Sequence, residues 1–258
     1  MKVTLLGTGT SQGVPVIACE CAVCKSLDPR DKRLRSSVML SKNGHNIVID
    51  SGPDFRQQML RERVMNLDAI VYTHEHKDHI AGMDDVRAFN FKASRDMHLY
   101  GNQGVGEALR REFHYAFSDF KYPGVPEVVF HEIDKESFQI GDFEILPVDV
   151  LHYKMPVKAF RVGGFGYITD ANFIATSEIE KFSGIDVLVI NALRKEKHPS
   201  HFNIKEAIAI VETIQPKKAY FTHISHLLGK HADVAKELPS GIEIAWDQLQ
   251  FDVSDSWN

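Results

Sequence analysis

Three histidines and an aspartate stand within six residues of this chain, in the run Thr73-His74-Glu75-His76-Lys77-Asp78-His79. Neutral imidazole and carboxylate are the ligands that zinc, manganese and iron accept in proteins. His-x-His spacing directs two rings to the same side of an extended segment, and Asp78 and His79 follow where a helix can begin. A solvated polar loop is the alternative. The density of a rare residue type, directly after the apolar segment 67–72, favours a two-metal centre.

Further ligand types stand at the ends of predicted strands, as a two-metal centre requires, because four ligands on one loop cannot complete two ions. His152 follows the apolar run 143–151, Asp170 follows 166–169, and His223 follows 219–222. A single aspartate or histidine at such a place is usually a cap or a hydrogen-bonded side chain. Their recurrence together with the run at 73–79 favours metal coordination.

The three cysteines of the chain, Cys19, Cys21 and Cys24, lie within six residues. An odd number so closely spaced is a poor basis for disulfides and agrees with a reducing compartment. Cys-x-Cys-x-x-Cys supplies three soft ligands, and a tetrahedral structural zinc needs a fourth. His226, three residues after His223, is the candidate, and residues 19–24 would form a zinc knuckle. Free buried thiols or a labile disulfide are the alternatives.

The elements that must position these residues fall into two β-rich blocks. In the first block the pattern predicts strands at 3–7, 37–41, 46–50 and 69–73, with a helix at 55–62. In the second block it predicts strands at 127–130, 137–140, 143–150, 159–162, 167–169 and 187–190. Gly163-Gly164 indicates a hairpin turn. A helix at 203–214 with Asn203 as N-cap, a strand at 218–222 and a short helix at 233–238 precede the C-terminal segment 242–253.

Residues 84 to about 125 have a different pattern, with aromatic side chains spread among basic ones and a helix predicted at 105–113. We expect a lid-like helical and aromatic insertion there. Two β blocks, each closed by helices, predict an α/β (α+β) protein of two sheets packed back to back with helices outside. The whole chain, 1–258, is expected to form one domain.

The composition of the chain argues against two classes of function, nucleic-acid binding and membrane association. With 258 residues and 43% hydrophobic content the chain can bury a large core. A net charge of -5 and a pI near 6.2 give no attraction to a phosphate backbone, so a nucleic-acid partner is not expected. The chain starts without a secretory pattern and has no apolar run of bilayer length, which predicts a cytoplasmic protein without membrane association.

The ordered set of ligand types resembles the metallo-β-lactamase fold hydrolases, which are four-layer αββα sandwiches with a dinuclear site along one edge. The resemblance implies that His74, His76 and His152 hold one ion, that Asp78, His79 and His223 hold the other, and that Asp170 bridges them. It also implies that Asp50 supports the metal loop through hydrogen bonds. Because position 78 is Asp rather than Cys, two ions of manganese, zinc or iron all suit the ligand set.

A narrower resemblance rests on the segment Gly7-Thr8-Gly9-Thr10-Ser11-Gln12-Gly13-Val14-Pro15, the cysteine cluster and Thr222-His223-Ile224-Ser225-His226. Together they look like the PhnP-type phosphoribosyl cyclic phosphate phosphodiesterases, which hold a structural zinc with three Cys and a His. This implies a metal-dependent phosphodiesterase that acts on a small, cyclic phosphate ester through a metal-activated hydroxide. His201, within Pro199-Ser200-His201-Phe202-Asn203, matches a histidine that related enzymes place beside the leaving group, and Asp78 is a second candidate for proton transfer.

Other readings of the same residues stay open. A lactonase or thioesterase uses the same hydroxide on an acyl carbon, RNase Z-like nucleases have a similar site, and PqqB, from pyrroloquinoline quinone biosynthesis, has a similar N-terminal pattern. A non-catalytic binding module retains the ligands without turnover. A homodimer is one assembly compatible with the chain.

Overall fold

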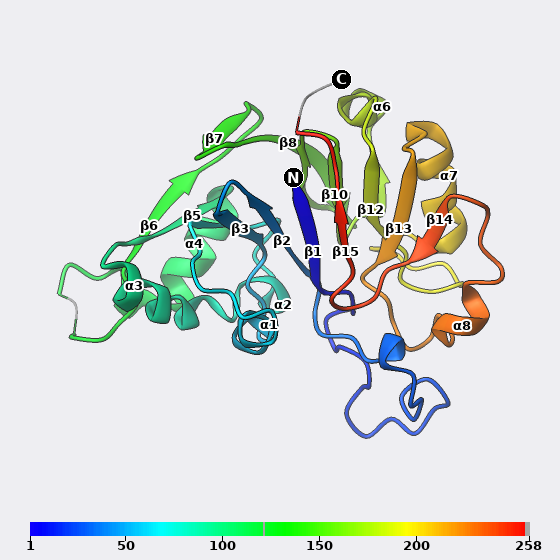
Figure 1. The fold of residues 1–258 in the computed structure, drawn as a ribbon, viewed down its shortest axis with the longest axis horizontal. Coiled ribbons are helices and arrows are strands. Elements are labelled where there is room, and N and C mark those ends of the chain that lie inside the picture. The colour runs from blue at the N-terminus through cyan, green and yellow to red at the C-terminus, as the bar shows by residue number, and fades with distance from the viewer. Residues whose placement is uncertain (121, 256–258) are drawn as a thin grey trace.

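The computed structural model describes residues 1–120 and 122–255, which form two β-sheets packed face to face with helices on both outer sides (Figure 1). The first sheet has seven strands in the order β15-β1-β2-β3-β4-β5-β6. Their bounds are Gln250–Asp252 (β15), Lys2–Gly7 (β1), Ser37–Lys42 (β2), His45–Ile49 (β3), Ala69–Val71 (β4), Met97–Gly101 (β5) and Val128–Glu132 (β6). From β3 to β6 the neighbouring strands are parallel.

The second sheet runs in the order β11-β8-β9-β10-β12-β13-β14, with β7 paired to β8. Its strands are Phe138–Ile140 (β7), Phe143–His152 (β8), Met155–Val162 (β9), Phe165–Ile168 (β10), Phe173–Ile174 (β11), Val187–Asn191 (β12), Lys218–Thr222 (β13) and Ile242–Ile244 (β14). The predicted hairpin at Gly163-Gly164 is confirmed, because Val162 pairs with Phe165 across it. Strands β10, β12, β13 and β14 are parallel to one another.

The helices form the two outer layers. Beside the first sheet lie α1 (Phe55–Arg61), α2 (Lys77–Ile80), α3 (Arg87–Ala93), α4 (Gln103–Glu112) and α5 (His114–Phe117), and beside the second lie α6 (Thr176–Ile179), α7 (Ile204–Ile214) and α8 (His231–Val234). Short 3-10 turns are Pro29–Asp31, Met83–Val86 and Glu180–Phe182. Helix α7 begins where predicted, because the Asn203 side chain accepts from Glu206 N and the Glu206 side chain accepts from Asn203 N in a capping box.

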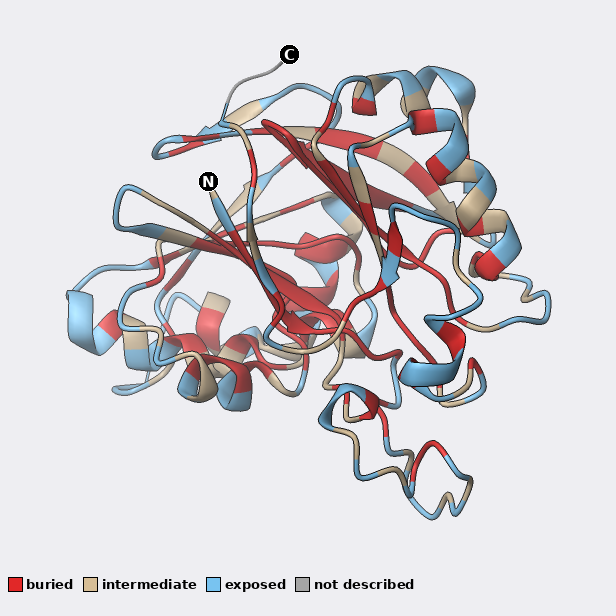
Figure 2. Cartoon of the chain, turned by 45° about the vertical axis from the view of Figure 1, so that its right-hand side comes forward, coloured by how far each residue is buried: buried red, intermediate tan, exposed pale blue. Residues whose placement is uncertain are grey.

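The core has three hydrophobic layers, which is the packing of an αββα sandwich. One lies between the sheets and includes Leu5, Ile49, Phe160 and Tyr167. The other two lie between each sheet and its helices. Buried residues follow the strands of both sheets, whereas the outer sides of the helices are exposed (Figure 2). The predicted four-layer fold is confirmed.

The interpretation of residues 84–125 as an insertion missed a strand. That segment contains β5, which lies inside the first sheet between β4 and β6. Its sequence, Met97-His98-Leu99-Tyr100-Gly101, has a buried apolar residue at every other position, but polar neighbours obscured the alternation. The aromatic run after it divides in two: Phe113, Tyr115 and Phe117 pack against the helical layer, whereas Phe120 is 86% exposed.

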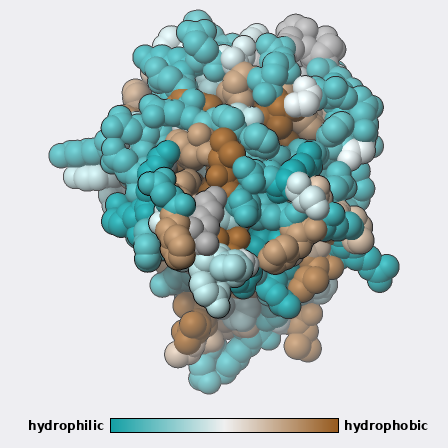
Figure 3. Space-filling view, turned by 90° about the vertical axis from the view of Figure 1, so that its left-hand side faces the viewer, coloured by the Kyte–Doolittle hydropathy of each residue, from teal (hydrophilic) through white to brown (hydrophobic). Residues whose placement is uncertain are grey.

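The surface over the β6 and α3 side of the molecule is mostly hydrophilic, with a few hydrophobic side chains near its centre (Figure 3). Among the helices of the described residues, none has the length and apolar character that a bilayer span requires. The short C-terminal helix lies at His231–Val234 rather than at 233–238, and the segment 242–253 forms two separate short strands, β14 and β15, one in each sheet.

Candidate metal centre

The predicted ligands come together because strands of both sheets end at the same edge of the sandwich. Asp50 and His223 are the first residues after β3 and β13, Asp170 is the second residue after β10, and His74 is the third residue after β4. Asp50, Asp170 and His223 have left-handed backbone conformations, with φ of 66°, 54° and 55°. Such conformations are uncommon for residues other than glycine, and they concentrate at functional sites, where the surrounding structure holds them in place.

Asp170 lies at the middle of the cluster. Its Oδ2 atom is 3.3 Å from His79 Nε2 and 3.2 Å from His223 Nδ1, while Asp78 Oδ2 is 3.2 Å from the same His79 Nε2. The atoms of three groups lie close enough together to hold an ion: His74, His79 and Asp170; Asp78, Asp170 and His223; and His152, Asp170 and His201. Because Asp170 belongs to all three groups, its position suits a bridging carboxylate.

His76 and His152 have their rings next to His74, but among the described residues His76 belongs to none of these three groups, and His152 is grouped with Asp170 and His201 rather than with His74. The ring centroid of His76 is 4.7 Å from that of His74 and 5.2 Å from that of His152. His76 is exposed, whereas His74 is fully buried. His152 Nδ1 is 2.8 Å from the carbonyl oxygen of Ser200, so Nδ1 carries the proton and donates, which leaves Nε2 as the free lone pair.

Asp50 makes the hydrogen bonds that were predicted for it. This fully buried carboxylate accepts from Thr73 N and Thr73 Oγ1, each at 2.8 Å, and lies 2.7 Å from His79 Nδ1. A carboxylate on one imidazole nitrogen fixes the tautomer and points the other nitrogen at a metal. His79 Nε2 therefore faces Asp78 and Asp170 as a candidate ligand atom.

The donor set fits divalent cations. Among the described residues, His74 Nε2 is a buried ring nitrogen without a hydrogen-bond partner, a costly arrangement unless another group satisfies it. Burial lowers the pKa of His74 well below its ordinary value and that of His223 to about 4, which keeps both rings neutral. His79 differs, because Asp78, Asp170 and Asp50 outweigh burial and raise its pKa well above the ordinary value, so a cation at this place would take over the role of the ring proton. Burial alone would raise the pKa of Asp170, but His223 and His79 hold it well below its usual range. Neutral imidazoles around an ionised carboxylate are what a dinuclear site needs.

His201 lies beside the centre, with Nε2 3.1 Å from Asp170 Oδ1. Its Nδ1 atom is 3.1 Å from both Ser200 Oγ and His198 Nδ1. His198 Nδ1 accepts from Ser200 N at 3.3 Å, which holds that ring in place. His198 and Ser200 are thus further residues of the site; the sequence His-Pro-Ser-His at 198–201 is the only signal for them, because their contacts depend on a loop conformation.

The cysteine cluster forms a second candidate metal site. His226 Nδ1 lies 3.3 Å from Cys19 Sγ, 3.4 Å from Cys21 Sγ and 3.6 Å from Cys24 Sγ. Zinc bond lengths in a tetrahedron require an N–S edge of about 3.5 Å, so the four ligand atoms fit one zinc ion. The Cys24 N–H, together with His226, lowers the pKa of the Cys21 thiol to about 6, while burial raises that of Cys24 to about 11.

The two candidate sites share one turn of the chain. Ile224, between His223 and His226, exchanges backbone hydrogen bonds with Thr8 and Thr10, and Thr10 Oγ1 is 3.3 Å from His223 Nε2. The knuckle itself projects beyond the sandwich near α8 (Figure 1). A metal bound at the knuckle would therefore anchor the segment from which His223 reaches the candidate dinuclear cluster.

Comparison with known protein families adds independent evidence for the family to which the chain belongs. The family described as "Beta-lactamase superfamily domain" matches residues 45–224. The chain is 37% identical to the Octanoyltransferase of Porphyromonas gingivalis over 97% of its own length and 51% of that protein's. It is 26% identical to the Ribonuclease Z of Methanosarcina acetivorans over 81% of this chain and 53% of that protein. The chain thus spans about half the length of these curated relatives.

Solved structures give a closer match over the full length. A new diphosphatase from the PhnP family has a TM-score of 0.91 and 40% identity, with 97% of each chain covered. Zn²⁺-bound PqqB from Methylobacterium extorquens has a TM-score of 0.81 at 18% identity, with 98% of this chain and all of that chain covered, which shows a shared fold.

Proposed function

Because the chain belongs to the β-lactamase superfamily and is a metallo-β-lactamase fold hydrolase of the PhnP type, we propose that it cleaves a small phosphate diester, in the first place a cyclic one. The observation that carries this proposal is the convergence of His79, Asp78 and His223 on Asp170, with His201 at 3.1 Å from the same carboxylate. Cleavage of a phosphodiester uses both features: a site for cations, and a proton donor for the departing alkoxide.

The proposed cofactors are two divalent ions, manganese or zinc and alternatively iron, and one structural zinc. The first ion would be held by His74, His76 and His152, the second by Asp78, His79 and His223, with Asp170 between them. The structural zinc would be held by Cys19, Cys21, Cys24 and His226. Bound together, two divalent ions lower the pKa of water and neutralise charge on phosphoryl oxygens.

Other side chains of this protein orient the candidate metal ligands, and one of them supplies the proton that the leaving alkoxide takes up. Asp50 holds the tautomer of His79, and the Ser200 carbonyl holds that of His152. His201 presents Nε2 toward the cluster while Nδ1 is supported by His198 and Ser200. We assign to His201 the transfer of a proton from Nε2 to the leaving alkoxide oxygen as the P–O bond breaks. Asp78 is the alternative residue for this proton transfer, because it lies with Asp170 and His223 in one group of candidate ligands at the same centre.

Two relatives favour specific alternatives. The PhnP-family structure at 40% identity is described as a diphosphatase, which makes a P–O–P bond the second candidate for cleavage. The relative named Octanoyltransferase makes a thioester the third, although the matched half accounts for only 51% of that protein.

A substrate panel with metal analysis tests the proposal. Purified protein is first assayed for metal content, and then for hydrolysis of ribose 1,2-cyclic phosphate, a dinucleoside diphosphate, octanoyl thioester and a lactone. We expect about three metal ions per chain and turnover of the cyclic diester. Cleavage of the thioester alone, or no turnover in fully metal-loaded protein, would overturn the assignment.

A further inference from the structure

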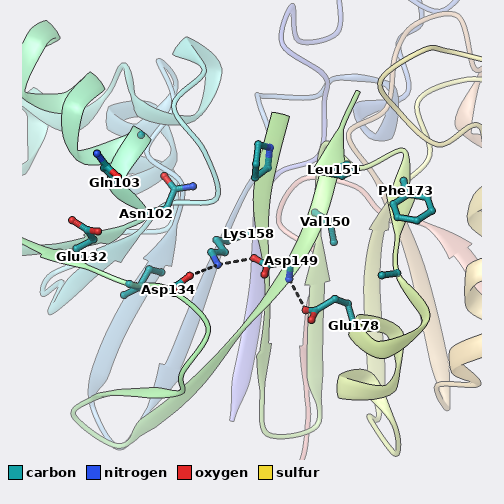
Figure 4. A pocket seen from close by; sticks show the side chains of 14 residues that line it. Asn102, Gln103, Glu132, Asp134, Asp149, Val150, Leu151, Lys158, Phe173 and Glu178 are labelled. Atoms are coloured by element: carbon teal, nitrogen blue, oxygen red, sulfur yellow. Dashed lines mark hydrogen bonds and ion pairs between the residues drawn. The ribbon is translucent and has the colours of Figure 1, made fainter. Parts of the chain in front are cut away.

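A cleft of about 670 Å³ lies between the start of α4 and strands β8 and β11, and it belongs to the candidate metal centre already described. Carboxylates line it, two of them beside Lys158, and Leu151 of its wall directly precedes His152 (Figure 4). Within the described part of the chain, a second groove is lined by none of the candidate ligands. This groove, of about 350 Å³, lies between α1 and α3 in the helical layer beside the first sheet. The proposed mechanism makes no use of it.

Apolar side chains around this groove are exposed to solvent. Leu60 and Met65 line it and are 61% and 65% exposed, and Phe91, next to the lining residue Lys92, is 67% exposed. A single exposed apolar side chain is ordinary, but several around one groove mark an interaction surface. We call this surface the α1–α3 face and define it by Leu60, Met65, Asp85, Ala88, Phe91 and Lys92.

Four lining residues form one stripe along a continuous helical segment. The 3-10 turn Met83–Val86 runs into α3 (Arg87–Ala93) without a break, because Val86 and Arg87 both have right-handed helical backbone angles. The lining residues of this segment are Asp85, Ala88, Phe89 and Lys92. Their spacing of i, i+3, i+4 and i+7 places them on one side of a helix. Along the stripe the order is therefore acid, small residue, aromatic residue, base.

The stripe is complementary to a copy of itself that runs in the opposite direction. Ala88 and Phe89 lie at its midpoint, and Asp85 and Lys92 are equally far from that midpoint along the chain. A two-fold axis at the midpoint would place Asp85 of each chain opposite Lys92 of the other. Two-fold symmetry requires such self-complementarity, because the same patch forms both sides of the interface.

The charges at the two ends of the stripe are available for this pairing. Among residues 1–120 and 122–255, neither Asp85 nor Lys92 has a side-chain hydrogen bond or an ion pair. The neighbouring Asp84, by contrast, pairs with Arg87 at 3.4 Å. Arg56 of α1 also lines the groove, so the lining carries charges of both signs. Charges of both signs suit a copy of the same surface better than a ligand that carries one sign.

The apolar side chains on both sides of the stripe fit the same arrangement. Phe89 contacts Phe55 of α1, with ring centroids 6.4 Å apart, so α1 lies on the Phe89 side. An antiparallel two-fold contact keeps α1 on the same side in both chains, so Leu60 and Met65 would pack against their counterparts. Phe91, two residues after Phe89, lies on the other side of the stripe and would meet its own counterpart there. Aromatic residues and methionine are enriched in the cores of protein interfaces.

We propose that the α1–α3 face is the interface of a homodimer, in which α3 packs antiparallel against α3 of a second copy and Asp85 of each chain pairs with Lys92 of the other. The proposal is independent of the proposed function, since none of these residues is a candidate metal ligand. Dimerisation would stabilise the helical layer behind the metal loop. The reason is that the same segment follows α2, which carries two of the candidate ligands, and buries Met83 and Val86 completely.

Sedimentation velocity of the metal-loaded protein at several concentrations tests the interface. We expect a reversible dimer whose Tm rises with protein concentration, because association stabilises the folded state. Leu60→Glu places a carboxylate of each chain in the apolar part of the interface and should raise the dissociation constant at least about hundredfold. Leu27→Glu is the matched control, because Leu27 is 97% exposed beside the cysteine cluster and outside this face. It should leave the dissociation constant unchanged.

Exchanging the two charges tests the pairing itself. Asp85→Lys and Lys92→Asp, made singly, each put like charges opposite one another twice in the dimer and should weaken it at least about tenfold. The double variant restores opposite charges across the interface and should dimerise within about threefold of the unaltered protein. Its charges still oppose the helix dipole, so recovery would report the contact between the chains and not the stability of α3.

A monomer at every concentration would overturn the proposal. A dimer that Leu60→Glu leaves intact, or that the double variant does not recover, would do the same. A monomer that binds a hydrophobic dye, with the binding lost in Leu60→Glu, would show that a different occupant covers this face and would also overturn the proposal.

Discussion

Replacing Asp50 tests whether a buried carboxylate outside the ligand set prepares the metal centre. Asp50→Ala removes the acceptor of three hydrogen bonds, from Thr73 N, Thr73 Oγ1 and His79 Nδ1. The hydroxyl can turn elsewhere, but the other two donors stay buried. An unsatisfied buried donor costs about 1–3 kcal/mol, so the free energy of unfolding should fall by about 2–6 kcal/mol. Because the free energy of unfolding of typical domains is only about 5–15 kcal/mol, this variant is at risk of unfolding.

Asp50→Asn separates stability from metal binding. The amide oxygen can still accept from Thr73 N, but the amide nitrogen cannot accept from His79 Nδ1. His79 would then favour the tautomer protonated on Nε2, which has no lone pair for a metal. Loss of such a supporting carboxylate typically lowers metal affinity about 10–100-fold, which corresponds to about 1.4–2.7 kcal/mol.

The assay is competition with a chromophoric chelator, alongside urea unfolding of the metal-free protein. Asp247→Asn is the matched control, because the Asp247 side chain is only 8% exposed and accepts from Thr8 N, Thr8 Oγ1 and Leu34 N, beside Arg61 at 3.2 Å. It should lower stability without changing affinity at the dinuclear centre. An Asp50→Asn variant that binds metal within about twofold of the unaltered protein would refute the role of Asp50. Equal losses in Asp50→Asn and Asp247→Asn would attribute the effect to general destabilisation.

The remaining predictions concern single side chains. His76→Ala should abolish hydrolysis while far-UV circular dichroism stays unchanged, since His76 is exposed; unchanged turnover would contradict the ligand assignment. Cys21→Ser should remove about one metal ion per chain and lower the Tm, because a structural zinc contributes folding free energy, and elemental analysis with calorimetry checks both. His198→Ala should slow cleavage of esters with poor alkoxide leaving groups by about 10–100-fold and spare p-nitrophenyl esters, which need no acid; equal slowing of both would indicate a merely structural role. Burial, with Arg33 nearby, lowers the pKa of His231 to about 4 in the folded protein. Between about pH 6.5 and pH 4 the unfolded chain binds a proton at His231 that the folded protein does not. The free energy of unfolding is therefore highest above about pH 6.5 and falls as the pH drops toward 4. Urea unfolding of His231→Gln should show a flatter pH dependence in this window, and an unchanged slope would show that other groups cause it.

The local sequence was sufficient to predict the ligand types and most of the elements that carry them. The run 73–79 follows a buried strand, and strand ends at His152, Asp170 and His223 were recognisable because apolar runs stop there abruptly. The helix cap at Asn203 was equally visible, since a capping box is a local interaction over four residues. Local rules predict such features well because their energies involve neighbours in the chain.

Long-range pairing decided what the sequence could not. Strand β5 is a strand because β4 and β6 flank it, and its polar residues at positions 98 and 100 hide that from any local pattern. The Asp134–Lys158–Asp149 cluster and the contact of His198 with His201 join segments whose approach depends on how loops pack. The cleft along β8 has the same origin, since its two walls come from α4 and β11, more than 60 residues apart in the chain.

The sequence by itself determined that this chain carries two sets of candidate metal ligands, because imidazole, carboxylate and thiolate have that chemistry wherever they lie. Only the tertiary structure decided that Asp170 stands between His79 and His223, that Asp50 selects the tautomer of His79, and that a carboxylate-lined cleft opens beside them. The physical reason is that the capacity to bind a metal is a property of a single side chain. Distances, tautomers and the electric field depend instead on how many residues are packed together.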